Sequence, residues 1–514
     1  MNFGLLKPKI QVAQLSDFTL FLFCKKIKTD TIMGVLSSLY GTSLSLLTDL
    51  YQLTMAYGYY KNGMKNREAV FHLFFRKNPF GGRFAVAAGL EYAVDFIRNF
   101  RFAPDDLDYL AGLCGNDGKP LFDPDFLRYL ETYRLCCDVD AIPEGTPVLP
   151  HQPLLRIKGP LIDGQLLETP LLNIINFQTL IATKAARVCQ ATQGDAVLEF
   201  GLRRAQGIDG SLAASRAAFI GGCSATSNVL AGKLLGIPVK GTHAHSWVMS
   251  FDTEREAFEK YAQAMPNNCV FLVDTYDTLE GVKNAIEIGR RLKAQGYQMA
   301  GVRLDSGDMA DLSIKARQLL DEAGMPHALI VASNDLDEHS IAQLKQQGAK
   351  IAVWGVGTNM VTAYDQPALG GVYKLGAIKA NNDQQWQYRI KLSETPIKTS
   401  NPGILQVKRT LSANGQVCDM IFNELQPYEG VTLKGFDGNT YTLPTAKGAQ
   451  VSYLLQPIFR NGEQTYSLPK LADIRAYAVR QLATSSFENA QNGLAENLYE
   501  LKRNLIKQHQ VIAL

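Results

Sequence analysis

The sequence predicts an α/β protein, with a parallel α/β barrel and a second, mixed α+β domain. Two observations support this fold class. From Val197 onward, short apolar segments alternate with helical segments, and such repetition is typical of strands that pair in parallel. Polar or glycine-rich residues directly follow most of the apolar segments, as they do at the carboxyl-terminal face of barrel enzymes. A doubly wound open sheet is the alternative architecture.

The length and composition indicate more than one domain. The 514 residues, 46% of them hydrophobic, can bury a large core. We expect a disordered N-terminal extension, the first part of the mixed domain, the barrel, and a C-terminal part that is β-rich and then helical. These segments cover residues 1–32, 33–164, 165–380 and 381–514. The apolar run Phe18–Cys24 is too short to cross a bilayer and lacks a signal-peptide cleavage site.

The segment before the barrel combines helical and β-like patterns. Apolar residues recur at helical spacing near Thr48 and Asp49, either of which can cap a helix. A turn with proline and glycine at residues 77–82 indicates a hairpin between two apolar runs. In order, we expect a helix over Leu46–Tyr59, the hairpin strands Ala69–Arg76 and Phe84–Ala88, a helix over Gly89–Phe100, a β segment over Thr146–Ile157 and a long buried helix over Gln165–Thr192.

Seven apolar segments are the expected barrel strands. They are Val197–Phe200, Ile237–Lys240, Cys269–Val273, Met299–Leu304, Leu329–Ala332, Ile351–Val356 and Val372–Ile378. Helical segments lie between several of them, namely Leu279–Ala294, Met309–Ala323 and Ser340–Gln347. Beyond residue 380 we expect the mixed domain to resume, with strands over Gln385–Leu392, Leu405–Leu411 and Val451–Phe459 and helices over Leu471–Leu482 and Leu494–Ile506.

Six of these strands are followed by charged, polar or glycine residues that could bind a ligand or act in catalysis. The clusters are residues 199–204, 241–246, 274–277, 303–308, 333–335 and 355–358. Parallel strands point their carboxyl ends to one edge, so we expect these clusters to form a single site. Helix caps would supply serine, aspartate and glycine, but they would not supply two arginines and two histidines.

The cluster after the fourth strand, in MAGVRLDSGD (Met299–Asp308), is the most informative. Arg303 offers a planar fork of donors suited to a carboxylate or a phosphate. Asp305 and Asp308 can hold a cation or accept hydrogen bonds from sugar hydroxyls. An ordinary helix-capping turn is the alternative.

Two further clusters add an imidazole and a glycine-rich turn. His243 and His245 could be a metal pair, but the other five histidines do not follow later strands, so one imidazole is expected to act as a nucleophile or general acid/base. A structural histidine is the alternative. Gly355 and Gly357 allow close backbone approach, so the N–H groups there could hold a phosphate; a tight turn is the alternative.

Charge and cysteine usage exclude other classes. The net charge of +3, from 52 basic and 49 acidic residues, disfavours nucleic acid as a partner. Eight cysteines without CxxC spacing indicate free thiols in a reducing compartment rather than a disulfide or zinc framework. We therefore expect a cytoplasmic protein that binds neither nucleic acid nor membrane.

Five motifs in this order resemble the nicotinate phosphoribosyltransferase family. They are TDLYQLTM (Thr48–Met55), EFGLRR (Glu199–Arg204), GTHAHS (Gly241–Ser246), VRLDSGD (Val302–Asp308) and GGVYKL (Gly370–Leu375). With KLSE (Lys391–Glu394) and Pro402–Gly403, the resemblance runs from about Leu46 to at least Gly403.

The resemblance implies a fold and a reaction. The fold is an irregular, type II phosphoribosyltransferase-like α/β barrel with a second domain built from both chain ends, in a homodimer with shared active sites. The reaction joins nicotinate to 5-phosphoribosyl pyrophosphate and yields nicotinate mononucleotide and pyrophosphate, in NAD salvage. ATP is the co-substrate, hydrolysed to ADP and phosphate, and Mg²⁺ is the cofactor.

The resemblance also implies roles for individual residues. The phosphohistidine of the GTxAHS motif corresponds to His245, the expected catalytic residue, and catalytic Asp274 and Asp305 are expected near the ribose or magnesium. Nicotinate recognition carries over to Tyr51, Thr242 and Arg303. Phosphoribosyl and phosphate contacts carry over to Arg203, Ser333, Asn334, Gly355, Gly357 and Thr358.

Two competing functions remain at this point. A nicotinamide phosphoribosyltransferase would share fold and mechanism, but that family tends to carry a proline where Leu304 stands and an acidic residue for the amide. A non-catalytic barrel that senses nucleotides or phosphosugars would bind ligand without turnover.

Overall fold

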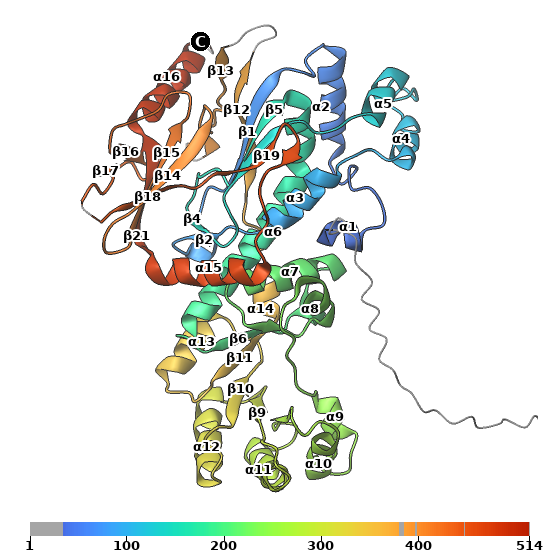
Figure 1. Cartoon of the computed structure of the whole chain (residues 1–514), viewed down its shortest axis with the longest axis vertical. Helices are drawn as coiled ribbons and strands as arrows, with labels where there is room; N and C mark the ends of the chain where they lie inside the picture. Colours follow the sequence, from blue (N-terminus) through green and yellow to red (C-terminus); the bar gives the residue numbers. More distant parts are fainter. Residues whose placement is uncertain (1–33, 380–384, 396–397, 447, 513–514) are drawn as a thin grey trace, which may run out of the picture.

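The computed structural model describes residues 34–379, 385–395, 398–446 and 448–512. A parallel sheet lies at one end of the body, and an antiparallel sheet and a mixed sheet lie at the other, with α6 (Leu161–Ala191) running between them (Figure 1). The predicted extension, residues 1–32, lies outside the described residues. No described helix combines the length and apolar character that crossing a membrane requires. The described cysteines carry free thiols.

Six strands form the parallel sheet. Hydrogen bonding gives the order β7-β6-β11-β10-β9-β8, and every neighbouring pair is parallel. The strands are β6 (Ala196–Glu199), β7 (Ala225–Thr226), β8 (Val270–Leu272), β9 (Gly301–Leu304), β10 (Leu329–Ala332) and β11 (Val353–Val356). The helices of this part are α7 (Ile208–Ile220), α8 (Val229–Leu235), α9 (His245–Met249), α10 (Glu254–Ala264), α11 (Thr278–Ala294), α12 (Met309–Glu322), α13 (Glu338–Gln346) and α14 (Thr358–Val361). The chain is therefore α/β with a parallel sheet.

The segment between the two edge strands differs from the prediction. The predicted strand Ile237–Lys240 is wrong, because only Val239 makes a single parallel bridge to β7. Pro238 has no N–H and interrupts a regular ladder. Further along, His243 Nε2 accepts a hydrogen bond from the Leu272 N–H of β8 at 3.2 Å. This segment thus contacts both β7 and β8, but no strand pairing joins these edges among the described residues, and a closed barrel stays a prediction.

The predicted seventh barrel strand, Val372–Ile378, belongs to another sheet. It forms β12 (Val372–Lys379), which pairs antiparallel with β1 (Glu68–Phe74). The connection from β11 to β12 contains only the four-residue helix α14, too short for the crossover that a parallel neighbour needs. This seven-stranded sheet has the order β13-β12-β1-β5-β3-β19-β20. Its other strands are β3 (Asp138–Ala141), β5 (Leu155–Pro160), β13 (Trp386–Tyr388), β19 (Gln456–Arg460) and β20 (Glu463–Gln464).

The predicted hairpin before residue 90 is also wrong. Its second strand, β2 (Ala85–Val86), pairs with β4 (Pro147–Val148) instead of β1. The 3-10 turn Pro79–Gly81, in which Phe80 has a φ of 57°, directs the chain away from β1. The predicted segment Thr146–Ile157 accordingly divides into β4 and β5, which lie in different sheets.

The C-terminal part forms the third sheet, with the order β17-β16-β21-β15-β14-β18. The sequence analysis missed β21 (Ser486–Ala495), because its asparagine, glutamine and serine are not typical of strands. The predicted strand Val451–Phe459 is two strands, β18 (Gln450–Tyr453) here and β19 in the seven-stranded sheet. The remaining elements are β14 (Leu405–Leu411), β15 (Gln416–Asn423), β16 (Thr432–Gly435), β17 (Thr440–Thr442), α15 (Leu471–Thr484) and α16 (Glu496–Ile512).

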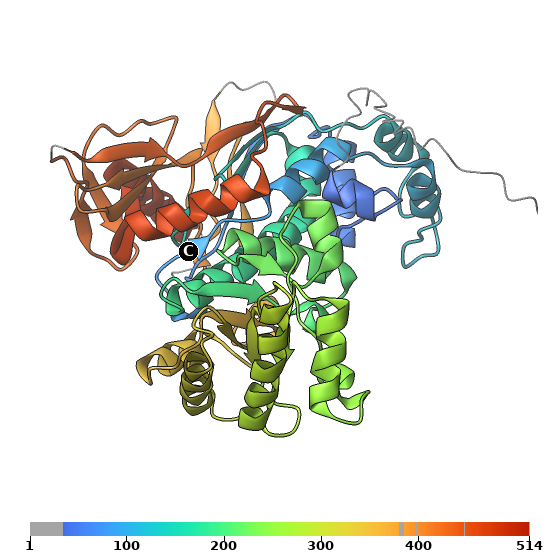
Figure 2. The ribbon, with the colours of Figure 1, turned by 60° about the horizontal axis from the view of Figure 1, so that its bottom comes forward.

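The predicted helices before the parallel sheet are confirmed with shifted ends. They are α2 (Leu50–Lys61), which begins after Asp49, α3 (Leu90–Asn99) and the 31-residue α6. Three shorter helices accompany them, α1 (Val35–Leu39), α4 (Pro104–Ala111) and α5 (Pro124–Glu131). α6 packs against α2 and β1 near its N-terminal end and against α7 and α13 towards its C-terminal end. Figure 2 shows these elements with the lower end of the molecule brought forward.

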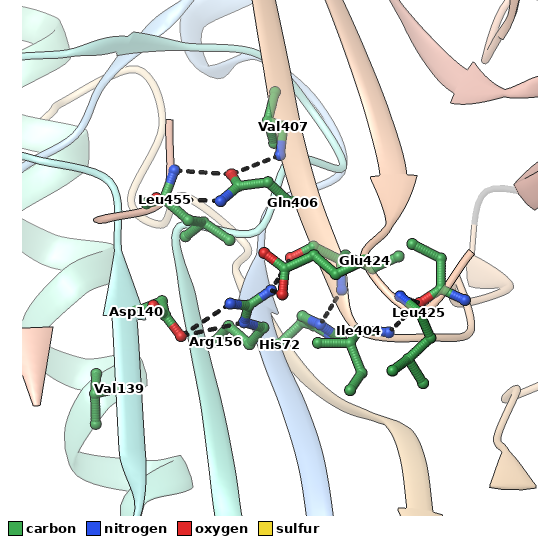
Figure 3. A network of polar contacts seen from close by, with 12 residues as sticks. His72, Val139, Asp140, Arg156, Ile404, Gln406, Val407, Glu424, Leu425 and Leu455 are labelled. Carbon is green, nitrogen blue, oxygen red and sulfur yellow. Dashed lines mark hydrogen bonds and ion pairs between the residues drawn. The ribbon is translucent and has the colours of Figure 1, made fainter. Parts of the chain in front are cut away.

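A buried polar network joins the seven-stranded sheet to the third sheet (Figure 3). Arg156 of β5 donates to Asp140 Oδ2 and to the carbonyl oxygen of Leu405, each at 3.0 Å, and its Nη1 lies 2.8 Å from Glu424. His72 Nε2 accepts from the Leu405 N–H at 3.1 Å. Burial, with a smaller effect from the charge of Arg156, lowers the pKa of His72 to about 3. The imidazole is therefore neutral at pH 7, as its acceptor role requires.

Replacing His72 with glutamine is expected to reduce the acid sensitivity of the fold. The unfolded imidazole binds a proton near pH 6.5 and the folded one only near pH 3, so the free energy of unfolding falls as pH drops between these values. One such proton contributes up to about 1.4 kcal/mol per pH unit to the slope. Urea denaturation from pH 7.5 to 4.5 measures this slope. Equal slopes for wild type and His72→Gln would contradict the assignment, and His509→Gln, at an exposed histidine, is the control.

Candidate active site

A cavity of about 540 Å³ lies at the carboxyl ends of the parallel strands. Ten of the twelve residues singled out from the sequence line it, so the structure brings these strand ends together. They are Arg203, Thr242, His245, Arg303, Asp305, Ser333, Asn334, Gly355, Gly357 and Thr358. Tyr51 and Asp274 are not among the lining residues.

Arg303, near the end of β9, links the ends of β9 and β10 to the segment before α9. Its Nε donates to Ser333 Oγ at 2.7 Å and its Nη1 donates to Thr242 Oγ1 at 3.0 Å. Its Nη2 donates to Asp305 Oδ1 at 2.9 Å. A guanidinium has five N–H groups, so one N–H on each terminal nitrogen is left for a ligand. The guanidinium also lies 5.8 Å from the ring centroid of Phe200, which closes one side of the cavity.

These contacts set the charge of Asp305. Burial alone raises the pKa of its carboxyl group, but the hydrogen bond from Ser333 and the charge and hydrogen bond of Arg303 lower it by more. The net pKa lies below the usual value, so Asp305 is an anion at neutral pH.

His245 begins α9 and its side chain is 39% exposed to the cavity side. Its Nδ1 lies 3.2 Å from Thr275 Oγ1. Its Nε2 lies 3.7 Å from Asp305 Oδ2 and 4.0 Å from Asp274 Oδ1, so Asp274 stands beside this imidazole without lining the cavity. Two carboxylates near Nε2 favour a proton on that nitrogen, which leaves Nδ1 with the lone pair.

His243 occupies a different environment from its neighbour. It is 8% exposed and packs against the rings of Tyr261 and Phe258. Burial lowers the pKa of His243 to about 4, so the ring is neutral and accepts the Leu272 N–H. His243 therefore holds the backbone between Thr242 and His245 against β8, which is the structural role that the sequence analysis kept as an alternative.

The glycine-rich turn after β11 is shaped by packing as well as by access. A Cβ atom at Gly355 would lie 2.7 Å from the Phe200 ring, so only glycine fits beneath that ring. After the neighbouring strand β10, Asn334 has a φ of 117°, a value that residues other than glycine rarely adopt. Such backbone strain is concentrated at functional sites.

Glu199 fixes the start of the EFGLRR segment. Its side chain is buried, and Oε2 accepts hydrogen bonds from Ser215 of α7 at 2.8 Å and from Thr226 of β7 at 2.6 Å. The Glu199 carboxylate therefore connects the end of β6 to α7 and β7. The chain then turns so that Arg203 and Arg204 reach the cavity, both exposed.

Comparison with known proteins decides the family. Three models match in order along the chain: the nicotinate phosphoribosyltransferase N-terminal domain over residues 46–176, the nicotinate phosphoribosyltransferase family over residues 196–411, and its C-terminal domain over residues 406–490. The nicotinate phosphoribosyltransferase of Bacillus subtilis is 44% identical over 447 residues, which cover 86% of this chain and 89% of that protein. The chain belongs to the nicotinate phosphoribosyltransferase family.

Other members agree in sequence and in structure. The human nicotinate phosphoribosyltransferase is 38% identical over 502 residues, covering 86% of this chain and 92% of that protein. The crystal structure of human nicotinic acid phosphoribosyltransferase superposes with a TM-score of 0.77 at 34% identity and covers 89% of this chain and 99% of that one. The nicotinate-nucleotide pyrophosphorylase structure from Pyrococcus furiosus, with a TM-score of 0.64 at 22% identity, shares the fold.

Tyr51 is separated from the cavity in this member of the nicotinate phosphoribosyltransferase family. It lies on the first turn of α2, beside Glu168 and Thr169 of α6, and is 48% exposed. Its neighbours Leu50 and Met55 are exposed apolar side chains as well. The structure therefore does not bring Tyr51 to the other predicted residues within one chain.

The lining residues that the sequence analysis did not propose as site residues include Phe200, Arg204 and Asp335. Phe200 was taken for the last residue of a strand, although its place inside the EFGLRR motif was a signal. Arg204 directly follows Arg203, and Asp335 follows Asn334, so both were within reach of the strand-end argument.

One acidic group outside the cavity has the spacing of a metal site. It consists of Glu338, His339 and Asp365. However, Lys184 Nζ lies 2.6 Å from Glu338 Oε2 and 2.7 Å from Asp365 Oδ1, so these carboxylates are already neutralised. This group is therefore an ion-pair network between α6 and α13.

The carboxylates beside His245 are better suited to Mg²⁺. Asp274 has a side chain only 1% exposed, and its Oδ1 has no hydrogen-bond partner among the described residues. Asp305 Oδ2 approaches the same imidazole. Mg²⁺ prefers such oxygen ligands together with water and phosphate, so the donor set fits this ion.

Proposed function

We propose that this chain is an ATP-dependent nicotinate phosphoribosyltransferase of NAD salvage. It joins nicotinate to 5-phosphoribosyl pyrophosphate and releases nicotinate mononucleotide and pyrophosphate, while ATP is hydrolysed to ADP and phosphate. Family membership supports the reaction. The observation that carries it is the convergence of Arg303, Thr242, His245, Asp305 and the turn at Gly355 on one cavity.

Nicotinate needs a cationic partner for its carboxylate and a flat apolar surface for its ring. Arg303 offers one N–H on each terminal nitrogen, a pair that matches a carboxylate, and Thr242 is held beside it. Phe200 supplies an aromatic face within the same cavity. The ring nitrogen can then be held in line with C1 of the ribose, which is the main geometric demand of the transfer.

The phosphoribosyl part needs positive charge and N–H donors. Arg203 and Arg204 supply the charge at the cavity wall, and Ser333 and Asn334 contribute polar groups. Gly355, Gly357 and Thr358 line the same cavity beside them, and their backbone offers N–H groups to a phosphate. The transition state resembles an oxocarbenium ion with pyrophosphate leaving, so such groups stabilise the charge that develops. Asp274 and Asp305 would hold Mg²⁺, which neutralises pyrophosphate charge when bound.

His245 is the proposed site of phosphorylation by ATP. The negative charges of Asp305 and Asp274 near Nε2 favour the tautomer with its proton there, so Nδ1 is the proposed nucleophile for the terminal phosphoryl group, with ADP as the leaving group. The phosphoryl group adds negative charge next to the pyrophosphate subsite. Its hydrolysis returns the imidazole and releases phosphate, and the charge repulsion favours departure of the product pyrophosphate.

A homodimer explains the position of Tyr51. Leu47, Leu50, Tyr51 and Met55 form an exposed apolar surface at α2, between 39% and 52% exposed. Contiguous apolar surfaces of this kind mark interfaces. We place Tyr51 in the nicotinate site of a second copy, where its ring would face Phe200 across the pyridine.

The alternatives make different demands. A nicotinamide phosphoribosyltransferase would need an acceptor for the amide N–H groups, whereas Arg303 and Thr242 suit a carboxylate. A non-catalytic sensor would not need an exposed imidazole between two carboxylates. Free thiols support a cytoplasmic location.

Turnover of nicotinate and nicotinamide, each with and without ATP, tests the proposal. We expect nicotinate to be used at least about a hundredfold better in kcat/KM, because an amide cannot form the charged pair with Arg303, and we expect ATP to raise the yield. His245→Ala should retain phosphoribosyl transfer and lose the ATP effect. Equal use of nicotinamide would contradict the substrate assignment, and ATP stimulation in His245→Ala would remove His245 from the coupling.

Arg303→Ala should raise the apparent KM for nicotinate about tenfold to a hundredfold, the cost of a lost charged hydrogen-bond pair. Arg303→Lys keeps the charge but not the fork, so its KM should lie between those of alanine variant and wild type. Initial rates over a range of nicotinate concentrations measure these values. An unchanged KM in Arg303→Ala would show that the carboxylate is held elsewhere.

Mixing two variants tests the shared site, at a nicotinate concentration low enough that each variant alone turns over little substrate. Tyr51→Ala and Arg303→Ala chains, unfolded together and refolded, should recover about a quarter of the wild-type activity, because half of the dimers then contain one intact site out of two. If Tyr51 acted within its own chain, every site would carry a defect and no activity would return. Each variant refolded alone is the control.

A further inference from the structure

The hydroxyl group of Ser333 belongs to a closed ring of hydrogen bonds at the cavity wall. Ser333 directly follows β10, which pairs with β9, the strand that carries Arg303 (Figure 1). Ser333 Oγ accepts a hydrogen bond from Arg303 Nε at 2.7 Å and donates one to Asp305 Oδ1. The same oxygen of Asp305 accepts a hydrogen bond from Arg303 Nη2 at 2.9 Å. Ser333 is therefore the member of the ring that comes from the neighbouring strand.

This ring fixes the plane of the Arg303 guanidinium. Nε carries a single N–H, and together with one N–H of Nη2 it forms one edge of the planar group. Ser333 and Asp305 engage both donors of that edge, so a rotation about the Cδ–Nε bond would break two hydrogen bonds at once. The N–H groups that are left on the two terminal nitrogens are thereby held in one orientation.

Ser333 is itself held firmly by its surroundings. It is 4% exposed, whereas the side chain of Arg303 is 16% exposed and that of Asp305 is 30% exposed. Its Cβ lies 3.4 Å from the point that a Cβ at Gly355 would occupy, so the glycine-rich turn packs close to this side chain. A group that orients another one must be more rigid than its partner, and Ser333 meets this condition.

The donors of Ser333 are used within the protein. A serine has one hydroxyl proton and one backbone N–H. The hydroxyl proton goes to Asp305, and the N–H donates to the carbonyl oxygen of Leu304 at 2.9 Å. A phosphate oxygen is an acceptor, so a hydrogen bond from Ser333 to phosphate would require the hydroxyl to leave Asp305. In the observed arrangement, Ser333 acts on a ligand through Arg303 and Asp305.

The orientation of the guanidinium matters more for an acid than for an amide. A carboxylate accepts two parallel N–H groups, and this bidentate geometry requires the two groups to be coplanar. A carboxamide has a single oxygen and cannot use both donors in the same way. Loss of the Ser333 hydroxyl would leave the charge of Arg303 and its bonds to Thr242 and Asp305, but it would remove the partner of Nε. The guanidinium could then tilt away from the plane of the carboxylate.

We propose that Ser333 is a positioning residue that sets the preference for the carboxylate of nicotinate over an amide, because it holds the Arg303 guanidinium in the plane that a carboxylate needs. This inference rests on the proposed function, since it concerns the same substrate and the same cavity. It assigns substrate selectivity to a side chain that does not itself touch the substrate.

The kinetics of Ser333→Ala with nicotinate, nicotinamide and 5-phosphoribosyl pyrophosphate test the proposal. We expect kcat/KM for nicotinate to fall about tenfold, the cost of one charged hydrogen bond, and kcat/KM for nicotinamide to stay within about twofold of wild type. The ratio of the two values should therefore fall about tenfold. A simple loss of folded enzyme would lower both values equally and leave the ratio unchanged. The KM for 5-phosphoribosyl pyrophosphate should stay within about threefold, because Asp305 keeps its bond to Arg303.

Ser313→Ala is the matched control. Ser313 is also a buried serine, but its hydroxyl bonds only to the backbone, donating to the carbonyl oxygen of Ala310 and accepting from the N–H of Lys350, each at 3.0 Å. It does not line the cavity. Its variant should therefore keep the wild-type ratio of nicotinate to nicotinamide.

A double variant separates positioning from direct contact. Arg303→Ala has no guanidinium to orient, so the addition of Ser333→Ala should change kcat/KM for nicotinate by less than about twofold. If the serine contacted the substrate itself, or if its loss damaged the site in general, the two losses would multiply.

Three results would overturn the proposal. These are an unchanged ratio of nicotinate to nicotinamide in Ser333→Ala, losses that multiply in the double variant, and a raised KM for 5-phosphoribosyl pyrophosphate with an unchanged KM for nicotinate. The last result would assign the hydroxyl to a phosphate. A wild-type enzyme that does not use nicotinate would instead overturn the proposed function, and the role of Ser333 with it.

Discussion

The hydrogen bonds of Arg303 are the interaction on which the candidate site depends. Its three engaged nitrogens hold Ser333 after β10, Asp305 after β9 and Thr242 in the segment before α9. Asp305 in turn lies 3.7 Å from His245. One guanidinium therefore positions both Thr242, beside the proposed nicotinate carboxylate, and the carboxylate beside the imidazole. Because a planar fork tolerates little displacement of its partners, the parallel strands beneath it must keep their register. The geometry of the candidate site therefore depends on the packing of the parallel sheet through the side chain of Arg303.

Local patterns predicted most of the elements but not their partners. α3 and α6 were predictable because amphipathic or buried periodicity, with proline and glycine at the ends, depends only on nearby residues. The pairing of β12 with β1 was not predictable, because an apolar strand looks the same whichever sheet receives it. The predicted partner of β2 was wrong for the same reason. The turn before β2 suggested a hairpin with β1, but β2 forms its hydrogen bonds with β4. The partner of a strand is determined by the whole chain and cannot be predicted from a short stretch of sequence.

The candidate site was more predictable than the fold around it. Residues that follow parallel strands meet at one edge by geometry, so Arg203, His245, Arg303 and Gly357 could be grouped without any knowledge of loop structure. This argument does not apply to Tyr51, because it lies on the helix α2 and does not follow a strand of the parallel sheet. Phe200 was missed because an apolar side chain at a strand end does not itself indicate chemistry, although it stands inside the EFGLRR motif, and its packing on Gly355 shows its position.

The length of α6 has a consequence for how the protein can vary. Thr183 accepts a hydrogen bond from Val86 of β2, and the next residue, Lys184, pairs with Glu338 of α13. One added or deleted residue in the preceding turns would rotate this part of the helix by about 100° and shift it by about 1.5 Å. Both partners would then face the wrong side. Related chains should therefore tolerate insertions in their surface loops while keeping this helix free of gaps, and an alignment without a gap across it should mark true members.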